Sequence, residues 1–154
     1  MFKFVGRAES NQYLGFAINS EPYCINISLV QEIIYVPSIT KIPNVPSWIE
    51  GVIDLRGKIV RIVNLRRWFG YQYLTITPEA RILILDSKDG IFGLLVESVS
   101  DVFIADKLMK RDVPRIMLNE PEIGYLKSLI LNQSNIFSEI EPNSIRISGD
   151  GKNG

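Results

Sequence analysis

The sequence contains no histidine and only one cysteine among its 154 residues. Histidine is the most common general base at neutral pH and a frequent zinc ligand, so its absence removes the usual routes to acid–base catalysis and to zinc binding. The cysteine, Cys24, lies between Tyr23 and Ile25. A single cysteine cannot form an internal disulfide, which favours a reducing compartment, and with no histidine to activate its thiol we expect Cys24 to pack in the core.

The sequence also has no excess of charge, because 17 basic residues balance 17 acidic residues. This balance predicts no broad attraction to nucleic acid or to anionic lipid. No apolar run approaches the roughly 20 residues that a membrane-spanning helix needs. The first ten residues include Lys3, Arg7 and Glu9 and lack the apolar run of a signal peptide. We therefore expect a cytoplasmic protein that neither binds nucleic acid nor inserts directly into a membrane.

Motifs that bind phosphate, dinucleotides or metal ions are absent from the sequence. The carboxylates that an active site would use are scattered, with no spacing that brings two of them together: Glu32, Glu50, Asp54, Asp86 and Asp101. Solvated or salt-bridged carboxylates are the favoured interpretation of such a pattern. The sequence thus predicts no catalytic residues, no metal and no cofactor, and we expect that the protein is not an enzyme.

Hydrophobic residues make up 46% of the chain and occur in short runs separated by turns. This pattern favours a mostly β fold, a barrel or a sandwich, with only short helical turns. Strands are expected over residues 13–19, 23–27, 52–55, 59–65, 81–86, 91–96, 97–105, 125–131 and 136–140. Residues 29–36 combine a helical turn with a strand. We expect a flexible N-terminus over 1–12, one domain over 13–147 and a flexible tail over 148–154.

The stretch from Ile39 to Gly70 organises the rest of the chain. It begins with two prolines and continues into two apolar strands joined at Arg56-Gly57-Lys58, which predicts a β-hairpin. Trp48 precedes the first strand, and we expect it to cap the core. Arg56 is unusual, because most hairpin turns place asparagine or aspartate at such a position.

Glu32 and Arg56 both lie among apolar, strand-forming residues. Burying either charge alone would cost several kcal/mol, roughly, so each needs a partner. Their opposite charges lead to the hypothesis that they form a structural ion pair, which ties the segment around Glu32 to the hairpin turn.

A basic and aromatic cluster follows the hairpin turn and offers an alternative function. Its members are Arg56, Lys58, Arg61, Arg66, Arg67, Trp68, Phe69, Tyr71 and Tyr73. Basic and aromatic residues on a small barrel can bind single-stranded nucleic acid. However, strand alternation places Arg61 on the face opposite Ile62, and the whole chain is neutral, so a solvated face is the favoured interpretation. Steep loss of affinity with salt would distinguish a nucleic-acid binder from a groove that binds an apolar helix.

Three segments, in order and at matching spacing, resemble the signature of the CheW-like domain family. Residues 42–60 read IPNVPSWIEGVIDLRGKIV and match a pattern of proline, an apolar turn, Gly-Val-x-Asn-Leu-Arg-Gly and an aliphatic strand. Residues 30–33 (VQEI) match the family's Val-x-Glu-Ile, and residues 93–102 (GLLVESVSDV) match its Gly-hydrophobic-Val-Asp-x-Val-x-Asp-Val segment. The resemblance covers residues 13–105 well.

The resemblance implies two small five-stranded β-barrels packed side by side around a shared core. It implies a non-catalytic adaptor in bacterial chemosensory signalling, whose partners are a CheA-type histidine kinase and the cytoplasmic tip of a chemoreceptor. The positions that match the family's receptor-binding surface and its supports are Val30, Glu32, Gly51, Arg56, Gly57, Gly93 and Val102. The alternative is a β-barrel module that binds another protein or single-stranded nucleic acid.

The sequence departs from the family pattern at several positions. Asp54 replaces the usual asparagine, Asn64 replaces the usual aspartate before Leu65, and Arg61 stands where proline is common. Ser128 replaces a usual glycine, and the usual Leu-Leu-Asp ending is replaced over residues 135–140. The changes at 128 and 135–140 fall on the last strands and so on any partner surface there. Taken together, the departures suggest an accessory chemosensory system with its own kinase, for example one that controls surface motility.

Overall fold

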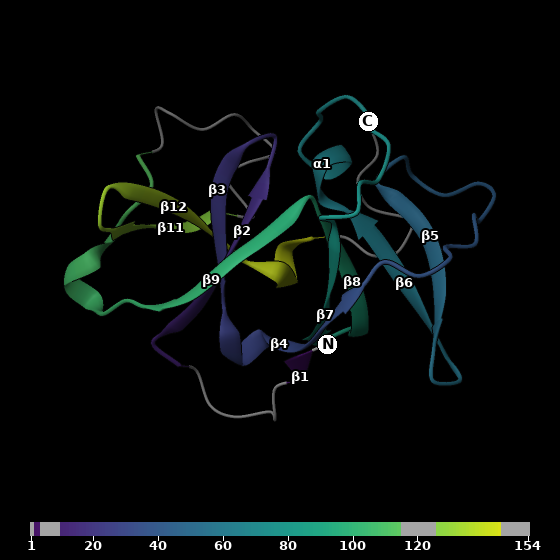
Figure 1. Cartoon of the computed structure of the whole chain (residues 1–154), viewed down its shortest axis with the longest axis horizontal. Coiled ribbons are helices and arrows are strands. Elements are labelled where there is room, and N and C mark those ends of the chain that lie inside the picture. Colours follow the sequence, from purple (N-terminus) through teal and green to yellow (C-terminus); the bar gives the residue numbers. More distant parts are fainter. Residues whose placement is uncertain (1, 4–9, 115–125, 146–154) are drawn as a thin grey trace.

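The computed structural model describes residues 2–3, 10–114 and 126–145. The expected tail over 148–154 therefore lies outside the described residues. The chain forms two β-sheets that lie side by side, with very little helix (Figure 1). The mostly β architecture predicted from the sequence is confirmed.

The first sheet follows the hydrogen-bonded order β1-β4-β7-β8-β6-β5. Its strands are β1 (Phe2–Lys3), β4 (Val30–Tyr35), β5 (Ile49–Leu55), β6 (Lys58–Asn64), β7 (Arg81–Ser87) and β8 (Gly90–Val96). Neighbouring strands run antiparallel, except that β6 and β8 run parallel. This parallel pairing places the hairpin of the organising stretch beside a strand from much later in the chain, with Ile62 opposite Gly93.

The second sheet follows the order β10-β11-β12-β3-β2-β9. Its strands are β2 (Gln12–Ile18), β3 (Glu21–Asn26), β9 (Ser98–Ile104), β10 (Lys110–Arg111), β11 (Leu126–Asn132) and β12 (Asn135–Ile140). Among the described residues, helical structure is limited to α1 (Leu65–Trp68) and to the 3₁₀ turns η1 (Ile27–Leu29), η2 (Lys107–Met109) and η5 (Pro142–Ser144). The strands expected over residues 125–131 and 136–140 are present as β11 and β12, which pair antiparallel.

Each sheet contains five strands of six or seven residues and one strand of two residues. The sequence led to the expectation of two closed five-stranded barrels. Within the described residues the order of paired strands ends at β1 and β5 in one sheet and at β9 and β10 in the other, so neither sheet closes as a ladder of strands. Beyond β5 the described residues add one isolated bridge, between Val52 and Thr40. Phe2 and Lys3, which were expected to belong to a flexible N-terminus, pair with Ile33 and Glu32 of β4.

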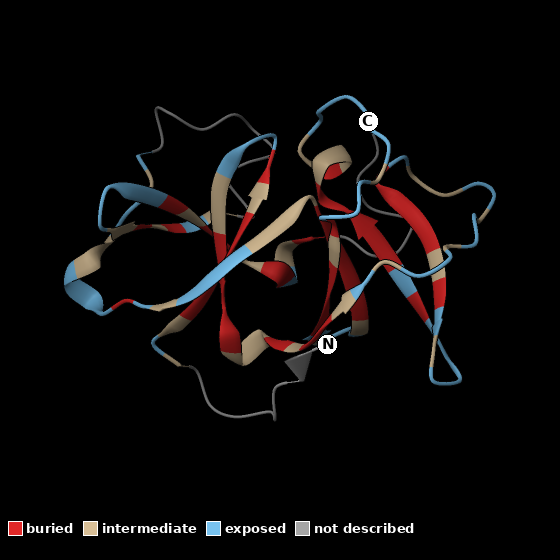
Figure 2. Ribbon diagram, viewed as in Figure 1, coloured by how far each residue is buried: buried red, intermediate tan, exposed pale blue. Residues whose placement is uncertain are grey.

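Both faces of the central strands β7 and β8 of the first sheet are largely buried, because each face meets a different apolar core (Figure 2). Along β7, Leu83 and Leu85 point into a core shared by the two sheets, whereas Ile82 and Ile84 point into a core of the first sheet alone. This explains why the strand RILILD is almost continuously apolar instead of alternating. The second sheet has its own smaller core, which includes Cys24 and Phe137.

Cys24 is completely buried in the core of the second sheet, as its apolar sequence context predicted. Burial raises the pKa of the Cys24 thiol far above its ordinary value, and the nearby carboxylate of Glu139 raises it further. A thiol that does not ionise is a poor nucleophile, so we expect Cys24 to resist iodoacetamide at pH 8 in the native protein and to react once guanidinium unfolds the chain. Alkylation of the native protein at the rate of a free thiol, followed by mass spectrometry, would contradict this burial.

Candidate functional site

A hollow of about 370 Å³ lies between the start of β4 and the tip of the β5–β6 hairpin. We call it the hairpin groove and define it by Val30, Glu32, Leu55, Arg56, Ile84 and Ile91. Its lining mixes apolar side chains with polar and charged ones, among them Lys58 and Asp86, and the ion pair between Glu32 and Arg56 stands at its edge. Three of the seven residues predicted for a receptor surface, Val30, Glu32 and Arg56, therefore line one concave site.

The ion pair of the hairpin groove is bidentate. Arg56 Nη2 donates to Glu32 Oε1 at 2.6 Å, and Arg56 Nη1 donates to Glu32 Oε2 at 3.1 Å. The hydrogen bond and the charge of Glu32 raise the pKa of Arg56 above its ordinary value. The two side chains expected to pair from the sequence are thus in contact, but only Glu32 is buried, since the Arg56 side chain is 60% exposed.

The backbone of the hairpin turn aims Arg56 at Glu32. Arg56 and Gly57 both have positive φ, 51° and 86°, which is the conformation of a two-residue turn that follows the twist of its strands. Asp54 Oδ1 accepts a hydrogen bond from the Gly57 backbone N–H at 2.8 Å and stabilises the turn. Asp54 therefore supplies the acceptor oxygen that the family's usual asparagine would also carry.

Gly51 does not line the hairpin groove. It has a φ of 151°, and a Cβ at this position would overlap the Thr40 carbonyl oxygen and lie 2.7 Å from Ile39 Cγ2. Thr40 and Val52 exchange two backbone hydrogen bonds of 2.9 Å, which hold the segment before the prolines across β5. The structural role of Gly51 is therefore to admit this close crossing.

Gly93 and Val102 also lie away from the hairpin groove. Gly93 is buried in the first sheet, where a Cβ would be 2.8 Å from Ile82 Cγ2 and still closer to Ile62. Val102 lies on β9 of the second sheet and is 45% exposed. The seven predicted residues thus comprise a group at the groove (Val30, Glu32, Arg56 and the adjoining Gly57) and three residues elsewhere.

Sequence reasoning missed a second buried carboxylate, Glu50. Its side chain is 5% exposed, its Oε1 accepts from Asn64 Nδ2 at 2.9 Å, and its Oε2 pairs with Lys41 Nζ at 2.9 Å. Asn64 Oδ1 also accepts from the Arg67 backbone N–H at the start of α1. The one sign of this network in the sequence was Asn64 itself, which stands where the family usually has aspartate.

That departure has a physical reason. An amide can donate to Glu50 and at the same time accept from the helix N-terminus, whereas an ionised carboxylate can only accept. An aspartate at position 64 would place a second negative charge against buried Glu50. Asparagine is therefore the residue that satisfies both neighbours.

Other residues that the sequence singled out have ordinary structural roles. Arg66, part of the possible nucleic-acid surface, is 12% exposed and pairs with Glu97 at 3.0 Å. Trp48 is buried and packs edge-on against Trp68 with ring centroids 5.1 Å apart, so it belongs to the shared core as expected. In the divergent last hairpin, Ser128 Oγ donates to the buried carboxylate of Glu139 at 2.7 Å, which a glycine could not do.

The described residues contain neither a metal-binding cluster nor a membrane-spanning helix. Within residues 2–3, 10–114 and 126–145, no three side chains of the metal-binding types gather in one place. In the same part of the chain, no helix has the length and apolar character required to cross a bilayer.

Comparison with known proteins identifies the class of this fold and groove. The model of the CheW-like domain matches residues 12–138, and the chain belongs to this family. It is 36% identical over 100 residues to the chemotaxis protein CheW of Klebsiella aerogenes, a match that covers 65% of this chain and 60% of that protein. It is 25% identical over 130 residues to the chemotaxis protein CheW of Bacillus subtilis, covering 84% and 83%.

A solved structure shares the architecture. The scaffolding protein TtCheW from Thermoanaerobacter tengcongensis superposes with a TM-score of 0.79 at 27% sequence identity, over 85% of this chain and 88% of that one. The resemblance recognised in the sequence is therefore confirmed at the level of family and of fold.

Proposed function

We propose that this protein is a non-catalytic adaptor of a bacterial chemosensory system that couples chemoreceptors to a CheA-type histidine kinase. The observation that carries the proposal is the match of the family model to residues 12–138. Relatives named chemotaxis protein CheW and a structural neighbour named as a scaffolding protein support the same role. The adaptor acts in the cytoplasm, where the kinase and the receptor tips are found, and needs no cofactor.

The hairpin groove is the proposed contact for the receptor tip. An amphipathic helix binds to a groove through apolar residues, and a charged group at the rim fixes its register. Val30, Leu55 and Ile84 supply apolar wall, and the Arg56 guanidinium stands exposed at the rim while Glu32 orients it. Gly57 belongs to the turn that presents Arg56, whereas Gly51, Gly93 and Val102 lie away from the groove and are not part of this proposed contact.

Affinity capture from the native lysate tests the adaptor function. With this protein as bait at moderate salt, we expect a CheA-type kinase and a chemoreceptor to be recovered together. Recovery of neither, from cells that express both, would show that the family match describes the fold and not the function.

Charge reversal tests the groove. We expect Glu32→Arg and Arg56→Glu each to weaken receptor capture at least tenfold, because each leaves two like charges facing one another, and the double reversal to recover part of the loss. Kinase capture should change less than twofold, and Lys107→Glu, at an exposed position of η2 beside β11 of the second sheet, serves as the control. If receptor capture is unchanged in both single variants, the receptor binds elsewhere; if the double variant shows only the summed losses, the pair does not act as a unit.

A further inference from the structure

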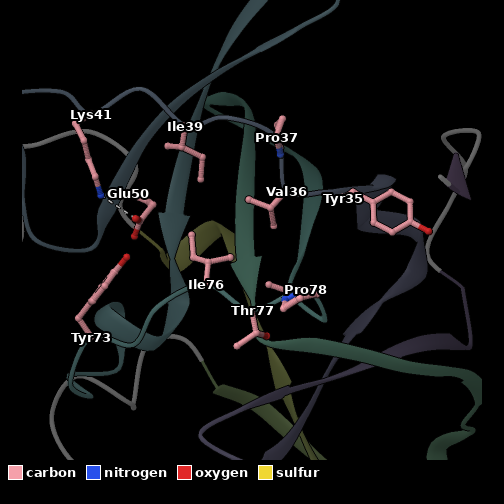
Figure 3. Close-up of a pocket in the computed structure, with 11 residues that line it drawn as sticks. Tyr35, Val36, Pro37, Ile39, Lys41, Glu50, Tyr73, Ile76, Thr77 and Pro78 are labelled. Atoms are coloured by element: carbon pink, nitrogen blue, oxygen red, sulfur yellow. Dashed lines mark hydrogen bonds and ion pairs between the residues drawn. The ribbon is translucent and has the colours of Figure 1, made fainter.

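A second cavity, of about 570 Å³, lies between the end of β4, residues 36–41 and the loop over residues 71–80. We call it the tyrosine pocket and define it by Tyr35, Val36, Ile39, Glu50, Tyr73 and Ile76. Figure 3 shows Val36, Ile39 and Ile76 in the middle of the pocket. At one end the hydroxyl of Tyr73 points toward the Lys41–Glu50 pair, and Tyr35 lies at the opposite end. The pocket shares no lining residue with the hairpin groove.

Glu50 places a buried carboxylate at one end of the pocket. Its carboxylate is almost completely buried, and Asn64 satisfies only one of its oxygens. A buried negative charge requires a positive partner, because removal from water is otherwise costly. In the structure that partner is Lys41.

Lys41 is a replaceable partner. Its side chain is 72% exposed, so holding it on Glu50 restricts a long, solvated chain at the mouth of the cavity. The hydrogen bond to Glu50 raises the pKa of Lys41 above its ordinary value. Lys41 already occupies Glu50 Oε2, and the Arg67 guanidinium lies 5.7 Å from the centre of the Tyr73 ring, so we expect an incoming cation to take the place of Lys41.

We propose that the tyrosine pocket receives an arginine side chain from a protein partner, whose guanidinium replaces Lys41 on Glu50. A guanidinium is planar and weakly hydrated, so it loses less on burial than an ammonium and can stack on a tyrosine ring. The methylenes of the arginine lie on Val36, Ile39 and Ile76. Tyr35, at the far end, is 62% exposed with the Arg81 guanidinium 4.4 Å from the centre of its ring, and its exposed surface is available to an apolar residue next to the arginine.

The inference goes beyond the adaptor function and does not depend on it, because it concerns a different cavity. The test uses the purified full chain and synthetic probes. The arginine site can therefore be disproved while the protein still captures kinase and receptor, and the adaptor function can be disproved while the arginine probe still binds.

The first experiment compares a charged probe with its neutral isostere. Blocked arginine (acetyl, methylamide) and blocked citrulline are titrated into ¹⁵N-labelled protein and followed by amide chemical shifts. We expect saturable shifts at Ile39, Lys41, Glu50 and Ile76 with arginine and at least fivefold weaker binding of citrulline. Lys41→Ala should bind the arginine probe at least threefold more tightly, because no competitor remains, and Lys88→Ala should match the natural protein.

The second experiment tests the carboxylate and the source of the arginine. Glu50→Gln should lose the preference for arginine over citrulline. If this variant does not fold, the comparison of arginine with citrulline in the natural protein and in Lys41→Ala still tests whether the pocket recognises a positive charge. A blocked Leu-Arg-Leu peptide should bind at least fivefold more tightly than blocked arginine. No shifts at the pocket, or equal binding of citrulline, overturns the site, and equal binding of peptide and amino acid overturns a protein partner.

Discussion

Asn64→Asp is expected to lower the free energy of unfolding by about 3–5 kcal/mol, the usual consequence of leaving a buried charge uncompensated. Asn64 Nδ2 donates to Glu50 Oε1 at 2.9 Å, and the substitution replaces this donor with a second carboxylate. The new side chain can still accept from the Arg67 N–H, so the loss comes from the contact with Glu50 and not from the helix cap. Urea unfolding at pH 7, followed by circular dichroism, measures the effect.

The dependence on pH separates repulsion from the loss of a hydrogen bond. In Asn64→Asp the two close carboxylates bind a proton more tightly in the folded than in the unfolded chain, so stability should recover as the pH falls from 7 to 5. Asn64→Ala, the matched control, loses the same donor without adding charge and should not show this recovery. Adding Glu50→Gln to Asn64→Asp restores a donor–acceptor pair and should recover most of the stability; no recovery would contradict a direct contact between these side chains.

Gly51→Ala is expected to lower the free energy of unfolding by about 2–5 kcal/mol, from backbone strain and overpacking together. The φ of 151° is unfavourable for any residue with a Cβ, and that Cβ would collide with the backbone carbonyl of Thr40. Backbone cannot move aside as a flexible side chain can, so the crossing of Thr40 over β5 must open. The measurement is again equilibrium unfolding in urea.

Gly57→Ala provides the matched control for this prediction. Gly57 also has a positive φ, 86°, but among the described residues no atom lies within 4 Å of a Cβ placed there. It should lose only the strain of the left-handed conformation, roughly 1–2 kcal/mol. If Gly51→Ala were no more destabilising than Gly57→Ala, the close approach of Thr40 would not explain why glycine occupies position 51.

Much of the local structure could be predicted because it depends on neighbouring residues. Short apolar runs and the turns between them located the strands β2, β3, β7, β8, β11 and β12 to within a few residues. The absence of long helical periodicity agrees with the helices of three or four residues in the described part of the chain. The pairing of Glu32 with Arg56 could also be anticipated, since two opposite charges in apolar surroundings have few other ways to be satisfied.

The distribution of the predicted site residues could not be anticipated in the same way. Val30, Glu32 and Arg56 meet at the hairpin groove, but Gly51 supports the crossing of Thr40 and Gly93 packs under Ile82. A family motif marks positions that are required, and it does not distinguish a residue that touches a partner from one that shapes the backbone. That distinction depends on which strands become neighbours.

The sequence by itself determined the class of this protein: a neutral, histidine-free, β-rich chain with the ordered motifs of the CheW-like family. Those properties follow from composition and from contacts within a hairpin, which are local. Only the tertiary structure decided that Glu50 is buried between Lys41 and Asn64 and that the tyrosine pocket forms beside it. The reason is that residues 35–41, 50, 64 and 71–80 approach one another only after the strands have paired and the loop has packed against them, and no periodicity in the chain records that arrangement.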